Sequence, residues 1–366
     1  MTDIYEKRLE KLHEQMKENG VSCTLVTNST NLFYMTGYSP KKCERLLCVL
    51  FPLDSDPVLI VPNLHAMDSE KKCWIKDQRV WKDGENLYTL VKNILCEKKL
   101  IGVPFAVDNT MEYMHCAFFF NASPSSQYIP ASPLFSKLRM YKDAEEIKVM
   151  HESGALTDNA IKMLIDNILS GKSELELHNW IEYELGNKGM RQGFSNLIAS
   201  GINSASVHHK SGTRIPQVGD AVYFDIGGAY NHYWSDATRS IHIGKPSEKY
   251  VDAYNKVKDA QQIALDSIRP GVRACDVDAV ARNYLAKFGL GEYFIHRLGH
   301  GVGLNGHEEP NLSPDETLIL EPGMCFSCEP GVYFKGEWGI RIEDTVVVTE
   351  NGCDRFNHFT KELIII

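Results

Sequence analysis

The chain has 366 residues, of which 43% are hydrophobic and 24% charged, and its formal net charge is −9 at pH 7. This length exceeds the roughly 250–300 residues at which a single hydrophobic core stops growing, so we expect two domains. The acidic balance and the lack of a Lys/Arg cluster argue against a nucleic-acid partner, because phosphate binding needs a basic face.

The N-terminal segment is charged and amphipathic, and it predicts a helix with Leu9, Leu12 and Met16 on one face. It lacks the apolar stretch of a signal peptide, and the longest apolar run, "LLCVLFPL", is too short to cross a bilayer. The ten cysteines, spread from Cys23 to Cys353, fit small buried residues better than a disulfide framework. We therefore expect a cytoplasmic protein that has no membrane partner.

Residues 1–137 alternate short apolar runs, such as "CTLVT" and "PVLIVP", with charged helical stretches. This alternation is typical of an α/β domain with a mostly parallel sheet. The pattern then changes, because Asp143 and Glu146 form a capping box at the start of a long predicted helix. Further helices are predicted over 175–188, 250–268 and 275–288. With β-hairpins between and after these helices, we expect an α+β chain with domains over residues 1–137 and 138–366.

The stretch "FDIGGAYNHYWSDATRS", residues 224–240, predicts two strands joined by a tight turn. A turn centred between Tyr230 and Asn231 would place Asp225 directly opposite Asp236. Like charges that face each other across a ladder are destabilising unless a cation lies between them. The alternative is that both carboxylates are solvated on an exposed face of the sheet.

A second hairpin is predicted in "CFSCEPGVYFKGEWGIRIEDTVVVT", residues 325–349. A turn centred on Gly336 would place Glu329 opposite Glu343. The neighbouring residues are apolar, which indicates half-buried strands, where unpaired carboxylates are costly. Arg341 lies on the same face as Glu343 and would offset part of one charge, but it cannot offset the charge of four acids.

Between the hairpins, "FIHRLGHGVGLNGHEEP" places His296, His300 and His307 within twelve residues. Divalent Mn, Co, Zn and Fe accept imidazole and carboxylate ligands together. The four acids of the two hairpins would balance two divalent cations, so we expect a site for two metal ions that includes one histidine. Each histidine taken alone would more simply be a hydrogen-bonded loop residue, and it is the paired acids that favour the metal site.

Two shorter motifs are not interpreted as sites. "GVGLNG", residues 301–306, matches the GxGxxG pattern of dinucleotide-binding loops, but the following "HEEPNLSP" does not open the helix that this motif requires. "CFSC" matches CxxC, but it has no second pair and lies in a predicted strand, so structural cysteines are expected.

Taken together, "DIGGAYNHYWSD", "HRLGHGVG", "EPG" and "RIED" resemble the motifs of the pita-bread metallopeptidases, which include Xaa-Pro aminopeptidases, prolidases, methionine aminopeptidases and the metal-free creatinases. The resemblance covers residues 140–366 closely, and the first 137 residues resemble the smaller creatinase-like domain of the Xaa-Pro branch. It implies a curved antiparallel sheet flanked by helices over residues 138–366, in addition to the smaller α/β domain.

The resemblance also implies the ligands of the two metal ions. They are Asp225 for one ion, His300 and Glu329 for the other, and Asp236 and Glu343 for both. A hydroxide that bridges the ions would attack the substrate carbonyl, and Glu329 would pass a proton to the leaving nitrogen.

The remaining site residues follow from the same resemblance. His208 and His307 are expected to be catalytic, and His296 to contact the substrate, although each of the three would also fit a structural role. The family's common "PHG" is "VHH" here, and Asn311 stands where some prolidases carry an arginine that binds the C-terminal carboxylate of a dipeptide. Arg341 is the predicted substitute for this arginine in substrate binding.

We therefore predict a metallopeptidase with two divalent metal ions that cleaves Xaa-Pro bonds in dipeptides or short peptides. Manganese is the expected metal, with Co, Zn and Fe as alternatives, and a homodimer is the expected assembly. Three alternatives remain for the activity: an aminopeptidase for longer peptides, a metal-dependent amidase or lyase with a non-peptide substrate, and a binding protein without catalysis. The presence of all five ligands favours an enzyme.

Overall fold

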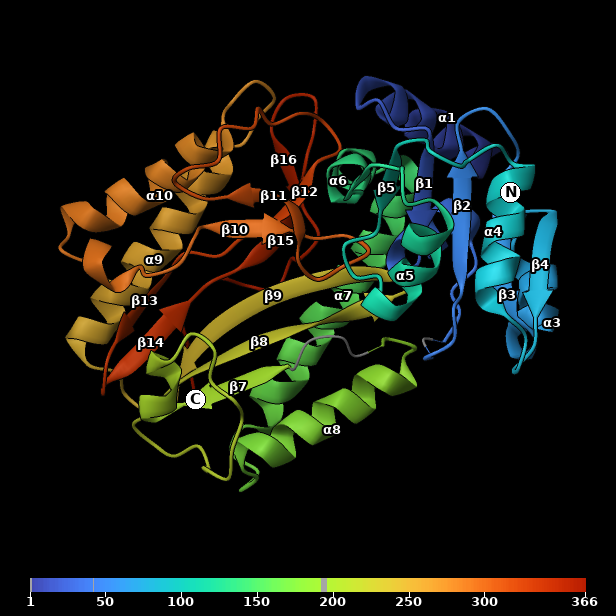
Figure 1. The fold of residues 1–366 in the computed structure, drawn as a ribbon. Helices are drawn as coiled ribbons and strands as arrows, with labels where there is room; N and C mark the ends of the chain where they lie inside the picture. Colours follow the sequence, from blue (N-terminus) through green and yellow to red (C-terminus); the bar gives the residue numbers. More distant parts are fainter. Residues whose placement is uncertain (1, 42, 192–195) are drawn as a thin grey trace. The chain divides into compact units, whose positions relative to one another are not determined.

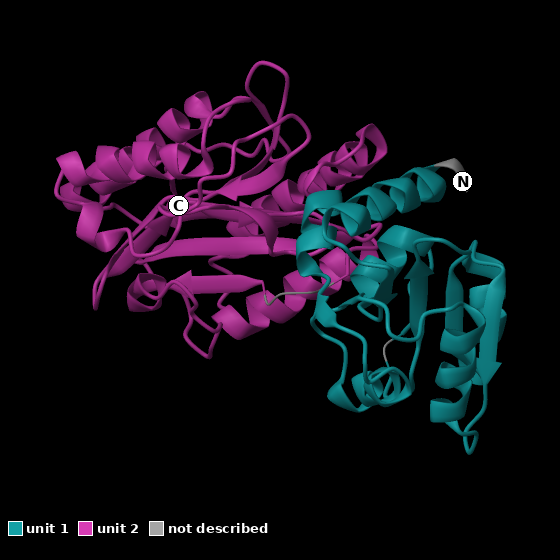
Figure 2. Ribbon diagram, turned by 45° about the horizontal axis from the view of Figure 1, so that its top comes forward, with its two compact units in different colours: residues 1–139 teal, residues 140–366 magenta. Residues whose placement is uncertain are grey.

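The computed structural model describes residues 2–41, 43–191 and 196–366. The chain divides into two compact units, residues 1–139 and 140–366, which Figure 2 shows in teal and magenta. Each unit has its own hydrophobic core. Among the described helices, none has both the length and the apolar character that a membrane span requires.

Unit 1 is built on one six-stranded sheet with the order β4-β3-β2-β1-β5-β6 (Figure 1). Its strands are β1 (Cys23–Val26), β2 (Cys48–Pro52), β3 (Val58–Pro62), β4 (Asp77–Trp81), β5 (Phe105–Val107) and β6 (Tyr128–Pro130). Its helices are α1 (Thr2–Glu18), α2 (Ser29–Thr36), α3 (Asn63–Lys72), α4 (Leu87–Glu97), α5 (Tyr113–Ala122) and α6 (Ser132–Met140). Three pairs of strands are parallel, whereas β2 is antiparallel to both β1 and β3. The sheet is mixed because the short connection between β2 and β3 can join only antiparallel strands.

Unit 2 begins with the long helix α7 (Ala144–Asn167), which starts at the predicted capping box. Asp143 accepts hydrogen bonds from the backbone N–H groups of Glu145 and Glu146, and the Glu146 carboxylate accepts one from the Asp143 N–H at 2.8 Å. The other three predicted helices are confirmed, as α8 (Glu174–Asn187), α9 (Glu248–Ser267) and α10 (Ala274–Lys287). Two short 3-10 helices lie in the connections, η1 (Gly201–Ala205) and η2 (Gly291–Tyr293).

The strands of unit 2 form three sheets, in which every pair is antiparallel except β9 with β17 (Figure 1). The four-stranded sheet has the order β17-β9-β8-β7 and consists of β7 (Leu197–Ser200), β8 (Ala221–Tyr230), β9 (Tyr233–His242) and β17 (Ile364–Ile365). The five-stranded sheet has the order β11-β10-β12-β15-β16 and consists of β10 (Gly299–Gly301), β11 (Glu308–Leu312), β12 (Cys325–Cys328), β15 (Asp344–Val348) and β16 (Cys353–Arg355). The hairpin of β13 (Gly331–Phe334) and β14 (Trp338–Arg341) is the third sheet. Helix α7 packs on β8 and β9, and α9 packs on β12, β13 and β14, so helices flank the antiparallel sheets as predicted.

The register of the β8–β9 hairpin differs from the prediction. Asp225 pairs with Thr238 and Asp236 pairs with Gly227, so the two acids are not directly opposite each other. The turn is centred one residue later than predicted, on Asn231 and His232, which both have positive φ (46° and 76°). A two-residue turn with both residues in this region matches the twist of the flanking strands. The acids are therefore diagonal neighbours on one face of the hairpin.

The register of the second hairpin is confirmed. Gly331 pairs with Arg341 in β13–β14, and the same register continues in β12–β15, where Cys328 pairs with Asp344. Glu329 and Glu343 lie opposite each other where the ladder is interrupted between these two segments. Their backbone N–H groups donate to other parts of the chain instead, at 2.8 Å to the Leu298 carbonyl and at 3.0 Å to the Thr238 carbonyl. The interruption thus joins this hairpin to β9 and to the segment before β10.

The two rejected motifs have ordinary structural surroundings. Residues 301–306 lead from β10 into β11, with no helix between them. Cys325 and Cys328 are fully buried in β12. Neither stretch has the local structure that cofactor binding or redox chemistry would need at these motifs.

Candidate metal centre and active site

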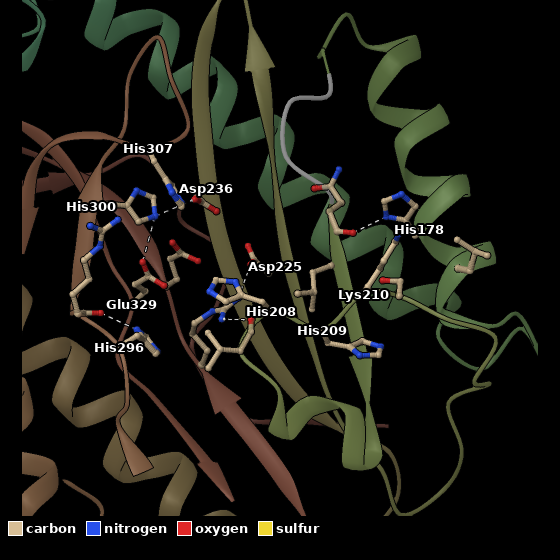
Figure 3. A pocket seen from close by; sticks show the side chains of 18 residues that line it. His178, His208, His209, Lys210, Asp225, Asp236, His296, His300, His307 and Glu329 are labelled. Atoms are coloured by element: carbon tan, nitrogen blue, oxygen red, sulfur yellow. Dashed lines mark hydrogen bonds and ion pairs between the residues drawn. The ribbon is translucent and has the colours of Figure 1, made fainter. Parts of the chain in front are cut away.

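All nine side chains predicted for the site line one cavity of unit 2, with a volume of about 610 Å³ (Figure 3). They are Asp225, Asp236, His300, Glu329, Glu343, His208, His296, His307 and Arg341. The acids come from β8, β9 and the interrupted second hairpin, and the histidines come from β10 and from three loops. The fold brings these residues together from distant parts of the sequence, while the role of each one stays a prediction.

Six of these side chains form three overlapping groups that suit a metal ion. Within each group, one ligand atom per residue lies within 4.8 Å of the others. The groups are Asp225 with Asp236 and Glu343, His300 with Glu329 and Glu343, and Asp236 with His300 and His307. Asp236, Glu343 and His300 each belong to two groups. Of these three, only the two carboxylates have two oxygen atoms with which one side chain can bind two neighbouring ions.

Asp236 shows most directly that the cluster fits a cation. Its side chain is buried, its Oδ1 atom has no hydrogen-bond partner among the described residues, and its Oδ2 atom lies 3.7 Å from His300 Nε2. A buried carboxylate oxygen without a donor is costly. Burial, together with the negative charges of Glu343 and Asp225, raises the pKa of Asp236 well above its ordinary value. A bound cation would remove both penalties.

The two glutamates are in a similar environment. Burial raises the pKa of Glu329 to about 7, and burial together with the charge of Glu329 raises the pKa of Glu343 well above its ordinary value. Each has one hydrogen bond from a hydroxyl group: Ser327 donates to Glu329 Oε1 at 3.1 Å, and Thr238 donates to Glu343 Oε2 at 2.6 Å. These bonds orient the carboxylates but supply no positive charge, so ionised forms of both need cations nearby.

Arg341 is the cation that balances Asp225. Its Nη2 atom donates to Asp225 Oδ2 at 2.5 Å, Nε donates to Thr238 Oγ1 at 3.0 Å, and Nη1 donates to the Tyr333 hydroxyl at 3.2 Å. The side chain is 3% exposed. It therefore offsets the charge of Asp225, whereas the sequence placed it beside Glu343. Its predicted part in substrate binding stays a prediction.

His300 is prepared to act as a ligand. Its Nδ1 atom lies 3.2 Å from the carbonyl oxygen of Gly301 and must carry the proton in order to donate to it, which leaves Nε2 as an acceptor. Nε2 lies 3.4 Å from Glu329 Oε1, and Figure 3 shows His300, Asp236 and Glu329 directed toward a common space. Burial lowers the pKa of His300 to about 3, so the imidazole is neutral at physiological pH.

The other histidines differ in burial and contacts. His296 is held at both ring nitrogens, at 2.8 Å from the Arg297 carbonyl and 3.1 Å from the Tyr333 hydroxyl, and burial lowers its pKa to about 3. His307 and His208 are exposed at the cavity, and the His307 ring centroid lies 3.8 Å from that of His300. His307 is thus close to His300, and His208 is open to the cavity.

Two of the residues that sequence reasoning missed act on the predicted site most directly. Thr238 lies two residues after Asp236 on the same face of β9, and this spacing was the available signal for its contact with Glu343. Arg297 lines the cavity, and its Nη1 atom donates to Asn311 Oδ1 at 2.5 Å. Its place directly after His296 was the available signal.

Antiparallel sheets surround a cluster of buried carboxylates and one buried histidine, which is the donor set of a metal-dependent enzyme. Residues 148–350 match the model of metallopeptidase family M24, and residues 8–141 match the model of the creatinase/prolidase N-terminal domain. The chain belongs to metallopeptidase family M24. This family implies divalent metal ions, and the donor set described above fits them.

Relatives resemble the chain over nearly its whole length. It is 34% identical to an Xaa-Pro dipeptidase of Lactobacillus helveticus over 98% of both chains, and 34% identical to an Xaa-Pro dipeptidase of Pyrococcus furiosus over 98% of this chain and 99% of the relative. Among solved structures, a prolidase of Thermococcus sibiricus matches with a TM-score of 0.94 and 36% identity over 99% of each chain. The predicted family and its fold are therefore confirmed.

Proposed function

We propose that the protein is an Xaa-Pro dipeptidase that hydrolyses the bond before proline with two divalent metal ions. The observation that carries the proposal is the set of three overlapping ligand groups, which share Asp236, Glu343 and His300. The named relatives with this activity, which match over nearly the whole chain, favour dipeptides over longer peptides. Manganese is the proposed metal because carboxylate oxygens dominate the donor set.

The proposed ligand roles are those implied by the sequence. The residues are Asp225 for one ion, His300 and Glu329 for the other, and Asp236 and Glu343 for both. When bound, two divalent ions lower the pKa of water and polarise the scissile carbonyl. Support for these roles comes from the clustered acids, of which only Asp225 forms an ion pair with an arginine, Arg341, among the described residues that line the cavity.

The side chains of the chain move the proton and hold the substrate. Glu329, one of the proposed ligands, would accept the proton of the attacking water and donate it to the proline nitrogen. His208 and His307, both exposed at the cavity, would hold the substrate carbonyl and its developing negative charge. His296 would support the substrate from the side of Tyr333, to which it is bonded.

The test is hydrolysis of Ala-Pro, Met-Pro and an Ala-Pro-Ala tripeptide by metal-depleted protein, with and without added manganese, cobalt or zinc. The proposal expects release of the first residue from the dipeptides only when metal is added. Release from the tripeptide alone would instead identify an aminopeptidase. Bound metal without turnover of any proline peptide would refute the proposal and favour a non-peptide substrate.

The proposal extends to three further features. We propose a boundary between the domains at residues 137 and 138, which the compact units 1–139 and 140–366 support. A homodimer is proposed from the resemblance, and a cytoplasmic location is proposed from the sequence. Size-exclusion chromatography with light scattering tests the assembly.

A further inference from the structure

We propose that Arg297, oriented by Asn311, binds the C-terminal carboxylate of the dipeptide substrate. The inference rests on the proposed function and names the group that selects dipeptides. It also answers the question raised by Asn311, which stands where an arginine would bind this carboxylate in some prolidases. In this chain the positive charge comes instead from Arg297, in the segment just before β10.

The backbone brings Arg297 and Asn311 to the same place. Arg297 lies two residues before Gly299, which pairs with Leu312, the neighbour of Asn311, in the β10–β11 ladder. The guanidinium donates from Nη1 to Asn311 Oδ1 at 2.5 Å, and Asn311 Nδ2 donates to Glu309 Oε2 at 2.9 Å. The bond to Glu309 orients the amide so that its oxygen faces the guanidinium. Asn311 is thus a positioning residue for Arg297.

Arg297 differs from the other arginine of the cavity wall in having no anionic partner. Arg341 is paired with Asp225, whereas Arg297 forms no ion pair with any carboxylate of residues 2–41, 43–191 and 196–366. Its side chain is half-buried and lines the cavity that contains the metal ligands. A guanidinium has five N–H donors in a planar fork that matches a carboxylate, so donors remain for an anion after the bond to Asn311.

The substrate has an anion at the required place. Three bonds separate the scissile carbonyl carbon from the carboxylate carbon of the proline residue, a path of about 4.3 Å at most. A dipeptide that reaches the metal ligands with its scissile carbonyl therefore keeps its carboxylate inside the same cavity. A peptide extended beyond proline has a neutral amide there, which cannot form the charge-assisted pair with Arg297.

The experiment compares Ala-Pro with Ala-Pro amide, which has the same scissile bond but no carboxylate, in the manganese-loaded enzyme. Wild type is expected to prefer Ala-Pro in kcat/KM, and Arg297→Met is expected to reduce the ratio of the two kcat/KM values about 30-fold, equal to ~2 kcal/mol at 1.4 kcal/mol per tenfold change. Arg297→Lys should keep part of the ratio, because the charge remains without the planar fork. Asn311→Leu should raise the KM for Ala-Pro more than it lowers kcat. Lys210→Met, which removes an exposed cation from the same cavity wall, is the matched control and should keep the ratio.

The outcomes separate this inference from the proposed function. One outcome is that wild type cleaves both substrates while Arg297→Met lowers the two kcat/KM values equally, so that their ratio is unchanged. In that case Arg297 does not bind the carboxylate, although the dipeptidase proposal stands. A loss of the preference in Lys210→Met alone would also overturn the inference. If wild type cleaves neither substrate, the proposed function fails and the inference fails with it. Metal content and melting temperature of each variant distinguish these results from misfolding.

Discussion

Removal of the metal ions is expected to make the protein less stable as the pH rises from weakly acidic to alkaline values. In the metal-free protein, burial raises the pKa of Glu329 from 4.5 to about 7, and the pKa values of Asp236 and Glu343 are raised as well. A carboxyl group with a raised native pKa binds its proton more tightly in the folded state than in the unfolded chain. Its contribution to stability is present below the unfolded pKa and is lost as the pH rises through the native pKa.

Glu329 alone gives the size of the effect. With 4.5 as the unfolded pKa and about 7 as the native pKa, linkage predicts a loss of about 2 kcal/mol between about pH 5.5 and about pH 8. Each kcal/mol corresponds to roughly 2–4 °C in the melting temperature of a domain of about 150–250 residues, so the fall should be about 4–8 °C. Asp236 and Glu343 increase the fall, because their pKa values are displaced in the same direction.

The assay is thermal unfolding of chelator-treated protein across this pH range, with and without manganese. Bound ions keep the carboxylates ionised and stabilise the native state, so the fall should disappear in the loaded protein. Metal-free Glu329→Gln keeps the size of the side chain without a titrating group. It should show a fall that is smaller by at least about 2 kcal/mol, because the charge of Glu329 also raises the pKa values of Glu343 and Asp236. A metal-free wild type whose melting temperature stays constant or rises over this range would refute the reasoning.

Three further predictions concern single side chains. Asp236→Asn should lower both metal content and kcat by at least about 100-fold, since a shared ligand is lost; a variant with two bound metals and full activity would contradict its assignment. Thr238→Val keeps the shape of the side chain but removes the hydroxyl that donates to Glu343, so metal affinity should fall about 10–100-fold, and an unchanged titration would exclude this role. Glu174→Gln should lower the free energy of unfolding, measured in urea, by about 1–3 kcal/mol. The reason is that the buried carboxylate accepts hydrogen bonds from His209 and from several other groups of residues 200–212. The substitution should also raise KM, because this loop carries the His208 side chain, and equal KM values would argue against that link.

The two hairpins show how far local sequence determines register. Gly336 has a φ of 81°, a conformation that glycine adopts at little cost, so its position in the sequence identified the second turn correctly. The first turn contains Asn231 and His232 at positive φ, and nothing in the letters "GAYNH" separated this pair from a turn centred one residue earlier. The error moved each partner by two residues. Side chains alternate with a period of two along a strand, so a shift of two residues leaves Asp225 and Asp236 on the same face. The two acids therefore still lie close together, as the prediction of the site required.

Contacts between distant segments explain what the sequence could not reveal. Thr238 and Glu343 are 105 residues apart, and Arg297 meets Asn311 only because β10 and β11 pair. Acids predicted to face one another can be recognised in the sequence, because such an arrangement is costly without a cation. A threonine or an arginine that contacts them is an ordinary residue at its position, so the sequence does not single it out. The same cost connects the site to folding: with Arg341 committed to Asp225, the remaining buried carboxylates depend on protons or metal ions for neutralisation. Metal binding should therefore stabilise unit 2 most at the alkaline pH values where protons no longer neutralise these groups.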